Sequence, residues 1–465
     1  MNESYDVIVL GTGLKECILS GLLSTKGKRV LHLDRNSYYG AETASLNLTN
    51  LWAMFRPGVE PPKEYGHNRD WNVDLIPKFI MANGKLVKML LHTKVTKYLE
   101  WKCVDATYVL QFQAGGMFSK AKNMISKVPA NEKEALMTPL LGMWEKKNVA
   151  NFYKFMDQYN EANPMTWKDV DVKKQPCEAV FKKFSLAENT VDFMGHAVAL
   201  HENDNYLKEP AVDTLQKIQL YMESMGKYGD SPFLYPVYGL GGLPESFSRL
   251  CAIHGGTYML NTAVDEIMFE NGAVCGVRVG NDVAKAPLVI CDPSYVKEQK
   301  RTRVAGRVIR AICILDHPIP NTNDVSSIQI ILPQKQLNRK SGKPCLPNHL
   351  QMSTSLWSPS LTQYALKISI LQSSLPPLSQ TTPRLKSLQR KNFSVQSGKC
   401  SSLLVTSMNQ STTGRKRTCS SLKVTTPPVI SRQVTLMYSA FTKELLERNL
   451  ISTCNSQRTM TNDQF

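Results

Sequence analysis

The chain has 465 residues and a formal net charge of +17, which by itself would suggest binding to nucleic acid or to a membrane surface. Residues 342–465, however, contain 15 Lys and Arg against 3 Asp and Glu, a net charge of +12. The preceding residues carry only +5, so nucleic acid is not an expected partner. At this length we expect two domains and enough chain for a large core.

The N-terminus, Met1-Asn-Glu-Ser, has neither the basic segment nor the apolar segment of a secretory signal. No apolar run approaches the roughly 18 residues that a membrane span requires. The eleven cysteines form no Cys-x-x-Cys pair, which favours reduced core cysteines over a zinc site or a disulfide framework. We therefore expect a cytoplasmic protein.

The first 40 residues predict a strand, a tight turn, a helix and a second strand. Val7 to Leu10 is apolar and rich in β-branched residues, which is typical of a strand buried on both faces. Gly11 and Gly13 form the turn, and residues 30–33 form the second strand. Asp34 follows Gly11 by 23 residues, close to the position of the acid that binds ribose in dinucleotide-binding units.

The turn departs from the dinucleotide fingerprint G-x-G-x-x-G, because Glu16 stands where the third glycine is required. In that fingerprint the helix N-terminus binds the pyrophosphate. A carboxylate in the first turn gains ~0.3–1 kcal/mol from the helix dipole and would repel a phosphate. We interpret Gly11, Gly13, Glu16 and Asp34 as a vestigial site and expect no cofactor. The alternative is a βαβ unit that never bound a ligand.

The later segments alternate between strand-like and helical patterns. Helical periodicity predicts helices at 134–159, 190–201 and 211–225. Strand-like segments lie at 73–80, 104–110, 231–238, 257–261, 273–279, 288–291 and 308–315. The predicted fold is α/β, with a discontinuous Rossmann-type domain (1–115 and 226–341) and an inserted α-helical domain (116–225). Residues 41–70 are expected to form a surface loop, and 111–126 an insertion of unknown role.

Residues 342–465 differ in character from the rest of the chain. Of these 124 residues, 36 are Ser or Thr, and such a composition buries too little apolar surface to offset the entropy of ordering. We find no strand or helix pattern longer than a few residues and expect this basic tail to be disordered. A shifted reading frame or retained intron from near Ser341 is the simplest account. The alternative is a basic interaction tail centred on Gly414-Arg-Lys-Arg.

The sequence contains no catalytic motif of the common kinds: there is no G-x-S-x-G, no P-loop and no H-E-x-x-H. His254 lies near Arg249 and Cys251, but a single histidine in a helical stretch more often packs than acts as a base. His196 and His201 are expected to be satisfied core or surface residues. We therefore expect no catalytic residue, no metal ligand and no enzyme activity.

Particular segments resemble the Rab GDP-dissociation inhibitors, which are relatives of the Rab escort proteins. The resemblance rests on Asp-Val-Ile-Val-Leu-Gly-Thr-Gly-Leu-Lys-Glu-Cys-Ile-Leu-Ser-Gly (6–21) and Leu-Asp-Arg-Asn-Ser-Tyr-Tyr-Gly (33–40), with further matches at 72–79, 82–87, 193–200 and 255–261. It covers about residues 4–341 and then stops. It implies the FAD/NAD(P)-binding, flavin-monooxygenase-like fold without flavin chemistry.

The resemblance also implies binding residues. It implies a Rab-binding platform of Tyr39, Arg249, Thr257 and Met259, and a mobile loop with Lys227 and Phe233 at its basic and aromatic positions. The family motif Gly-Leu-Gly-Glu-Leu-Pro reads Gly239-Leu-Gly-Gly-Leu-Pro here, so the platform glutamate is missing at Gly242. The helical domain would take the lipid, and its apolar stripes supply the candidates Phe152, Met156, Met194, Val198 and Leu215.

The function implied by the resemblance is that of a chaperone for Rab GTPases in vesicle trafficking. It would bind GDP-bound, prenylated Rab, slow GDP release, and extract and recycle Rab from membranes. The implied partners are Rab, its geranylgeranyl lipid and, transiently, the membrane, and we expect a monomer. Two alternatives are a flavin-dependent oxidoreductase of the same fold and a Rab escort protein, although the long acidic insertion of escort proteins is not found.

Overall fold

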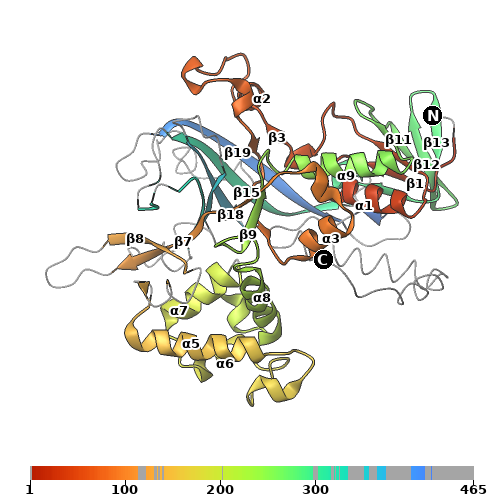
Figure 1. The fold of residues 1–465 in the computed structure, drawn as a ribbon. Coiled ribbons are helices and arrows are strands. Elements are labelled where there is room, and N and C mark those ends of the chain that lie inside the picture. Colours follow the sequence, from red (N-terminus) through yellow and green to blue (C-terminus); the bar gives the residue numbers. More distant parts are fainter. Residues whose placement is uncertain are drawn as a thin grey trace, which may run out of the picture.

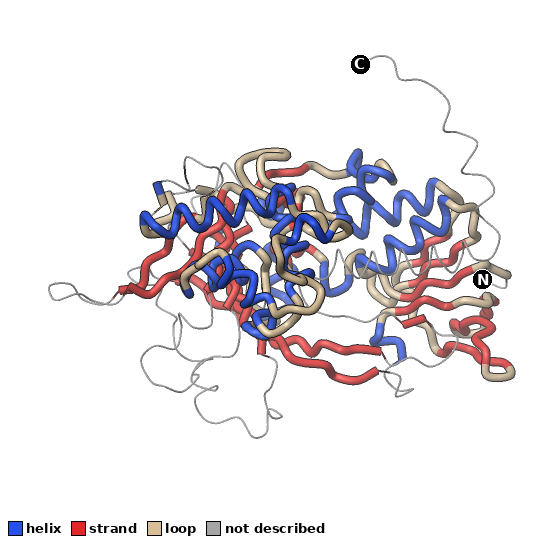
Figure 2. Tube along the Cα trace, turned by 90° about the horizontal axis from the view of Figure 1, so that it is seen from below, coloured by secondary structure: helices blue, strands red, loops and turns tan. Residues whose placement is uncertain are grey.

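In the computed structural model (Figure 1), a sheet-rich part contains the N-terminal residues. A helical part, built from residues 143–224, lies at one end of it. The structure describes residues 3–113, 122–129, 134, 137–138, 141–201, 203–296, 302–315, 319, 321–323, 325–332, 350–355, 364–372, 400–413 and 420–421. Figure 2 views the molecule from the side of the helical part. Among the described residues, no helix combines the length and the apolar character needed to span a bilayer.

A five-stranded parallel sheet contains the first strands of the chain. Its order is β10 (Thr257–Met259), β2 (Val30–Leu33), β1 (Val7–Leu10), β14 (Val289–Cys291) and β20 (Ser420–Ser421). The predicted strand–turn–helix–strand unit is confirmed, with α1 (Leu14–Thr25) between β1 and β2. Strands of this kind are buried on both faces, and all four residues of β1 are buried.

The two faces of this sheet are covered by different elements. Helix α1 packs against α9 (Gly242–Ile253), where Gly21 allows close approach to Phe247. A Cβ at Gly21 would lie 3.2 Å from the Phe247 side chain and carbonyl. The other face packs against a three-stranded antiparallel sheet of β11 (Glu266–Glu270), β12 (Ala273–Val279) and β13 (Asp282–Lys285). The result is the three-layer arrangement expected of a Rossmann-type domain.

A seven-stranded mixed sheet joins the Rossmann-type domain, which is built around the parallel sheet, to the helical part. Its order is β19 (Cys400–Thr413), β15 (Thr302–Leu315), β18 (Tyr364–Gln372), β17 (Leu350–Ser355), β16 (Ser327–Leu332), β7 (Ala106–Gln113) and β8 (Lys122–Lys127). Within this sheet β16 and β7 pair in parallel, and the other neighbouring strands that the structure describes pair antiparallel. The small sheets are β5 (Ile80–Met81), β9 (Phe233–Pro236) and β6 (Trp101–Cys103), and β3 (Ser45–Leu46) with β4 (Val73–Asp74).

The expectation that the tail holds no strands is wrong for the residues described there. Strands β17, β18, β19 and β20 all come from residues 350–421 and pair with β14, β15 and β16. The overlooked signal is local: in β18, Leu366, Ile368 and Ile370 alternate with Lys367 and Ser369, a period of two. The average Ser and Thr content hides this alternation. The other residues of 342–465 lie outside the described ones, so disorder there stays a prediction.

The helical part is built from α5 (Met143–Gln158), α6 (Cys177–Lys183), α7 (Glu188–Phe193), a π-helical turn (Met194–Val198) and α8 (Ala211–Ser224). The helix predicted over 211–225 is confirmed. Of the helix predicted over 134–159, Met143–Gln158 forms α5, which begins after Gly142, and the described residues 134 and 137 before it are also helical. The helix predicted over 190–201 changes to a π turn at Met194. A Cβ at Gly195 would overlap Tyr206, so this turn depends on a ring that comes from outside the helix.

Two other predictions differ from the structure. The loop expected over 41–70 contains α2 (Leu48–Phe55), whose first turn is capped by the Asn47 side chain, and its Trp52 packs against Tyr65. The strand expected over 73–80 is two short strands, β4 and β5. The remaining elements are α3 (Lys85–His92) and 3-10 helices at Ala41–Thr43, Lys63–Tyr65, Asn68–Asp70, Val95–Tyr98, Pro164–Trp167, Asp204–Leu207 and Pro293–Val296.

Candidate protein-binding surface and vestigial nucleotide site

An open pocket of about 200 Å³ lies at the start of α9. Arg249 is exposed on α9, and its guanidinium lies over the ring of Tyr98, 4.6 Å from the ring centre, a cation–π arrangement. The pocket is lined by Arg249, Tyr98, Glu100, Tyr238, Gly242 and Glu245, among others. Exposed aromatic and arginine side chains of this kind commonly dominate protein interfaces.

The other expected platform residues lie at the edge of the parallel sheet. Thr257 is exposed at the start of β10, and Met259 is half-buried at its end. Tyr39 is half-buried, with its ring 6.0 Å from that of Tyr258. A Cβ at Gly40 would lie 3.4 Å from the side chain of Pro244, in the first turn of α9. The Tyr39 loop therefore contacts the same helix end that borders the pocket.

The turn that the sequence suggested as a vestigial nucleotide site is closed by its own side chains. Asp34 accepts hydrogen bonds from the Thr12 amide (2.6 Å), the Thr12 hydroxyl (2.5 Å) and the Asn36 amide (2.8 Å). These bonds use the carboxylate that would otherwise bind a ribose. The same bonds hold Thr12 in place, and the Thr12 carbonyl accepts a hydrogen bond from the Gly40 amide at 3.0 Å. The loop that contains Tyr39 is fixed in this way.

Glu16 occupies the space where a phosphate would approach the turn. A Cβ at Gly13 would lie 2.5 Å from Glu16 Oε2, so the carboxylate folds back over the turn. Its other oxygen, Oε1, is buried and has no hydrogen-bond partner among the residues that the structure describes. Burial raises the pKa of Glu16 from 4.5 to about 7. These residues do not fit a dinucleotide, because a carboxyl group fills the cradle that its pyrophosphate requires.

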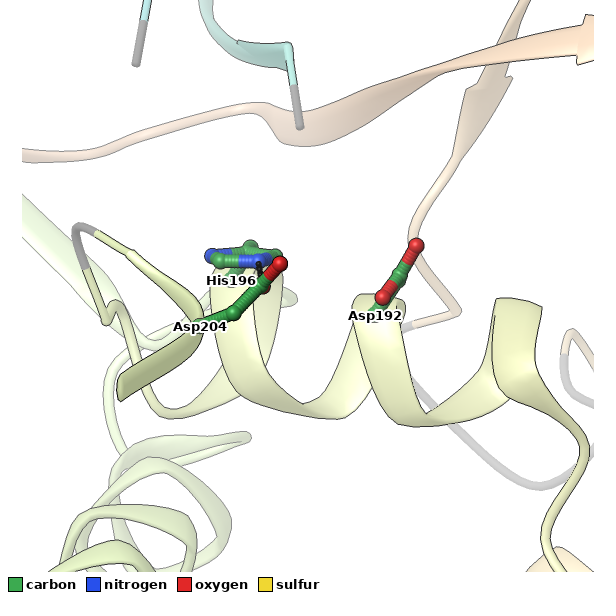
Figure 3. A group of neighbouring side chains, drawn as sticks. All are labelled: Asp192, His196 and Asp204. Carbon is green, nitrogen blue, oxygen red and sulfur yellow. Dashed lines mark hydrogen bonds and ion pairs between the residues drawn. The ribbon is translucent and has the colours of Figure 1, made fainter. Parts of the chain in front are cut away.

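The histidines of the helical part have protein partners. His196 is buried, and its Nδ1 donates to the carbonyl of His201 at 2.8 Å, while Nε2 lies 3.0 Å from Asp204 Oδ1. The His201 ring stacks on Tyr206 with centres 4.3 Å apart. Figure 3 shows His196 and Asp204 facing one another, with Asp192 on the same helix as His196. The expectation of satisfied core histidines is confirmed for His196.

Among the described residues, Asp192, His196 and Asp204 are also close enough to hold a metal ion, with ligand atoms within 4.8 Å of one another. The contacts of His196 with Asp204 and with the His201 carbonyl already account for both of its ring nitrogens. We therefore assign this group to packing of the helical part.

Comparison with known proteins identifies the family. The family model for the GDP dissociation inhibitors matches residues 1–345. The chain belongs to the GDP dissociation inhibitor family. It is 53% identical over 341 residues to a probable secretory pathway GDP dissociation inhibitor 1 of Schizosaccharomyces pombe, covering 73% of this chain and 75% of that protein. It is 52% identical over 342 residues to Rab GDP dissociation inhibitor beta of Rattus norvegicus, covering 73% and 74%.

Solved structures extend the match to the fold. The crystal structure of Rab GDI from Plasmodium falciparum has a TM-score of 0.82 and 41% identity, and the match covers 95% of this chain and 98% of that one. An oxidoreductase from Methanosarcina mazei has a TM-score of 0.54 at 15% identity, with 87% and 88% covered. This second likeness shows the fold alone. The expected family and the flavin-monooxygenase-like fold class are confirmed, and the family match ends at residue 345, close to the change in composition after residue 341.

One residue of the expected mobile loop is not available at the surface. Phe233 is 1% exposed and is the first residue of β9, where its ring packs against Phe79 and Tyr221. The prediction that it contacts a partner is therefore corrected: in this structure it is a core residue. Lys227 is exposed and donates to Asn83, and Tyr228, 49% exposed, is an accessible aromatic residue next to it.

The candidate lipid-binding residues lie together in one core. Phe152, Met156, Met194, Val198 and Leu215 are all at most 1% exposed and belong to the same hydrophobic cluster. They do not line the pocket beside Arg249. A lipid chain reaches them only if helices of this part, such as α5 and α8, move apart.

Two residues had no role in the sequence-based prediction: Tyr98 in the lining of the pocket, and the buried Asp74 behind it. Tyr98 lies 151 positions before Arg249, and no local pattern connects the two. Asp74 lies inside the matched segment 72–79, but its hydrogen-bond partners come from β3, from β9 and from the turn before α9. The available signal was a carboxylate in an otherwise apolar strand-like segment.

Proposed function

We propose that this chain binds GDP-bound Rab GTPases, slows the release of GDP, and extracts Rab from membranes for reuse in vesicle trafficking. The observation that supports this most directly is the exposed Arg249 beside an open pocket, at the position implied for the family's Rab-binding platform. The family match over residues 1–345 supports the same reading. The platform would comprise Tyr39, Arg249, Thr257 and Met259, and Lys227 of the expected mobile loop would be a further contact.

We further propose that the Rab partner is prenylated and that the helical domain (116–225) takes the lipid. Each CH₂ removed from water contributes ~0.8 kcal/mol, so a geranylgeranyl chain of about twenty carbons returns to the bilayer unless protein covers it. The aliphatic and aromatic core around Phe152 and Leu215 offers such cover once the helices separate. On this proposal the protein acts in the cytoplasm as a monomer, associates with membranes only transiently, and is not an enzyme.

The proposal is tested with purified full-length protein and GDP-loaded Rab, both geranylgeranylated and unmodified. We expect binding of the geranylgeranylated form, slower release of a fluorescent GDP analogue, and no flavin absorbance in the blue region of the spectrum. Stoichiometric flavin without Rab binding would favour the oxidoreductase alternative. Preference for unmodified Rab together with a prenyl transferase would favour an escort protein.

The variant Arg249→Ala is expected to weaken binding of geranylgeranylated, GDP-loaded Rab by about 10- to 100-fold, because a contact to a charged group contributes about 1.5–3 kcal/mol. Since Arg249 is exposed, the melting temperature should change little. The measurement is a binding titration alongside a thermal melt. Arg278→Ala is the matched control, since Arg278 is an exposed arginine that pairs with Glu266. An equal loss of affinity in both variants would contradict the assignment.

The variant Gly242→Glu is expected to strengthen Rab binding by about 1 kcal/mol, roughly fivefold. Gly242 is the first residue of α9 and lines the pocket, so a carboxylate there also interacts favourably with the helix dipole. A Cβ at this position lies 3.0 Å from the end of the Leu99 side chain, which can shift. Gly242→Gln has the same size without the charge and should give no gain. Equal affinities for the two variants would exclude a role for the charge.

A further inference from the structure

Asp74 is a buried carboxylate outside the pocket whose hydrogen bonds hold the turn that forms part of the pocket wall. It ends β4 and is 2% exposed. Both of its oxygens lie within hydrogen-bond distance of the Leu240 amide, at 3.0 and 3.1 Å. The Tyr235 hydroxyl also donates to it. Charge-assisted hydrogen bonds of this kind are stronger than neutral ones.

A second bond from the same network holds the next residue of the turn. The Ser45 hydroxyl donates to Asp74 at 2.5 Å and accepts the Gly241 amide at 2.9 Å. Two consecutive backbone amides, those of Leu240 and Gly241, are therefore held by one carboxylate, directly and through a serine. The Ser45 hydroxyl thus links β3 to the turn that precedes α9.

The turn is fitted closely to these partners. Gly239 has φ +87°, and a Cβ there would lie 2.8 Å from the Cβ of Ser45. A Cβ at Gly241 would lie 2.7 Å from the Ser45 amide. The turn therefore has little freedom to shift while the network is intact. The turn leads directly into α9, which begins at Gly242 and carries Arg249, so the position of the turn determines where this helix begins. Gly239, Gly242 and Arg249 all line the pocket.

We infer that Asp74 is a positioning residue for partner binding: through Leu240, Ser45 and Gly241 it fixes the turn and the first residues of α9, and so the geometry of the pocket. This inference rests on the proposed function, because Rab binding is one of its readouts. Loss of the carboxylate leaves the buried Leu240 amide without its acceptor. The turn then samples other positions, and Arg249 no longer meets the partner in a fixed geometry.

The test compares Asp74→Ala with Arg249→Ala and with the double variant, using full-length protein and geranylgeranylated, GDP-loaded Rab. We expect Asp74→Ala to weaken binding at least tenfold, and the double variant to bind about as weakly as Arg249→Ala alone, since both changes disable one contact. Hydrogen exchange at the amides of Leu240 and Gly241, measured without Rab, should accelerate in Asp74→Ala and not in Arg249→Ala.

Asp292→Ala is the matched control, because Asp292 is a half-buried carboxylate outside the pocket that accepts the Ser294 amide at 2.8 Å. It should leave Rab affinity and exchange at Leu240 unchanged. If Asp74→Ala does not fold, Ser45→Ala removes only the Gly241 arm and should give a smaller loss of affinity with faster exchange at Gly241. Wild-type affinity in a folded Asp74→Ala or Ser45→Ala variant, or fully additive losses in the double variant, would overturn the inference. Absence of Rab binding by the wild type would instead reject the proposed function, while the exchange result would still report on the turn.

Discussion

Gly195→Ala is expected to destabilise the helical part by more than about 3 kcal/mol, because inserting atoms into a packed core costs ~1–3 kcal/mol even when neighbours adjust. Here the neighbour has little room to adjust. A Cβ at Gly195 would overlap the Tyr206 hydroxyl and lie 2.8 Å from the ring atom Cε1. Tyr206 is buried, donates to the Val191 carbonyl at 3.1 Å and stacks on His201, so its displacement breaks these contacts as well.

The measurement is denaturant unfolding of the full chain, followed by circular dichroism. Gly142→Ala is the matched control, because Gly142 has negative φ and a Cβ there would meet nothing within 4 Å. We expect little change in the midpoint for the control and a large decrease for Gly195→Ala. Similar midpoints for the two variants would mean that the π turn rearranges without loss of packing.

Glu16→Gln is expected to make the protein more stable at pH 8, with little change at pH 5. Burial raises the pKa of Glu16 from 4.5 to about 7, so the folded state holds this proton up to a higher pH than the unfolded state. As pH rises from about 4.5 to about 7 the unfolded state ionises first, and the free energy of unfolding falls by about 3 kcal/mol. Above about pH 7 the folded state is ionised as well, and the loss in the free energy of unfolding no longer grows. Glutamine does not ionise, so the Glu16→Gln variant does not incur this loss at any pH.

The experiment compares unfolding midpoints of Glu16→Gln and wild type between pH 5 and pH 8. The pH dependence of the difference is the readout, since any cost of burying the amide is the same throughout. Glu178→Gln is the control, because Glu178 is an exposed residue paired with Lys182 and such pairs contribute little. A difference between wild type and Glu16→Gln that does not change with pH would show that Glu16 is ionised in the folded protein over the whole range.

The sequence predicts the parts of this structure that local patterns determine. The apolar runs at Val7–Leu10 and Val30–Leu33 and the glycine turn between them are all present as predicted, because burial on both faces leaves a continuous apolar signature. The π turn at Met194 was not predictable in this way, since it depends on Tyr206. Tertiary packing decides such positions, not helix propensity.

The candidate site shows the same division. The resemblance indicated Arg249, and in the structure this residue is exposed and lines the pocket at the start of α9. It also indicated Phe233, which is buried because β9 pairs with β5 and β6 on both sides. Whether an aromatic residue near a loop points outward or inward depends on strand pairing between distant segments. For the same reason the contact of Arg249 with Tyr98 could not be read from the sequence.

The order of strands in the parallel sheet has a consequence for synthesis of the chain. Strands β1 and β2 leave the ribosome first, but their neighbours β10 and β14 begin at residues 257 and 289. At about 5–20 residues per second, the early strands wait roughly 10 to 50 seconds for their partners. The helices between 143 and 224 make their contacts largely within one continuous segment, so they can assemble meanwhile. Helix α1 can cover one face of β1 and β2 at once, but the face that packs against β11, β12 and β13 stays uncovered during this interval. A holding chaperone would have its longest opportunity to bind there.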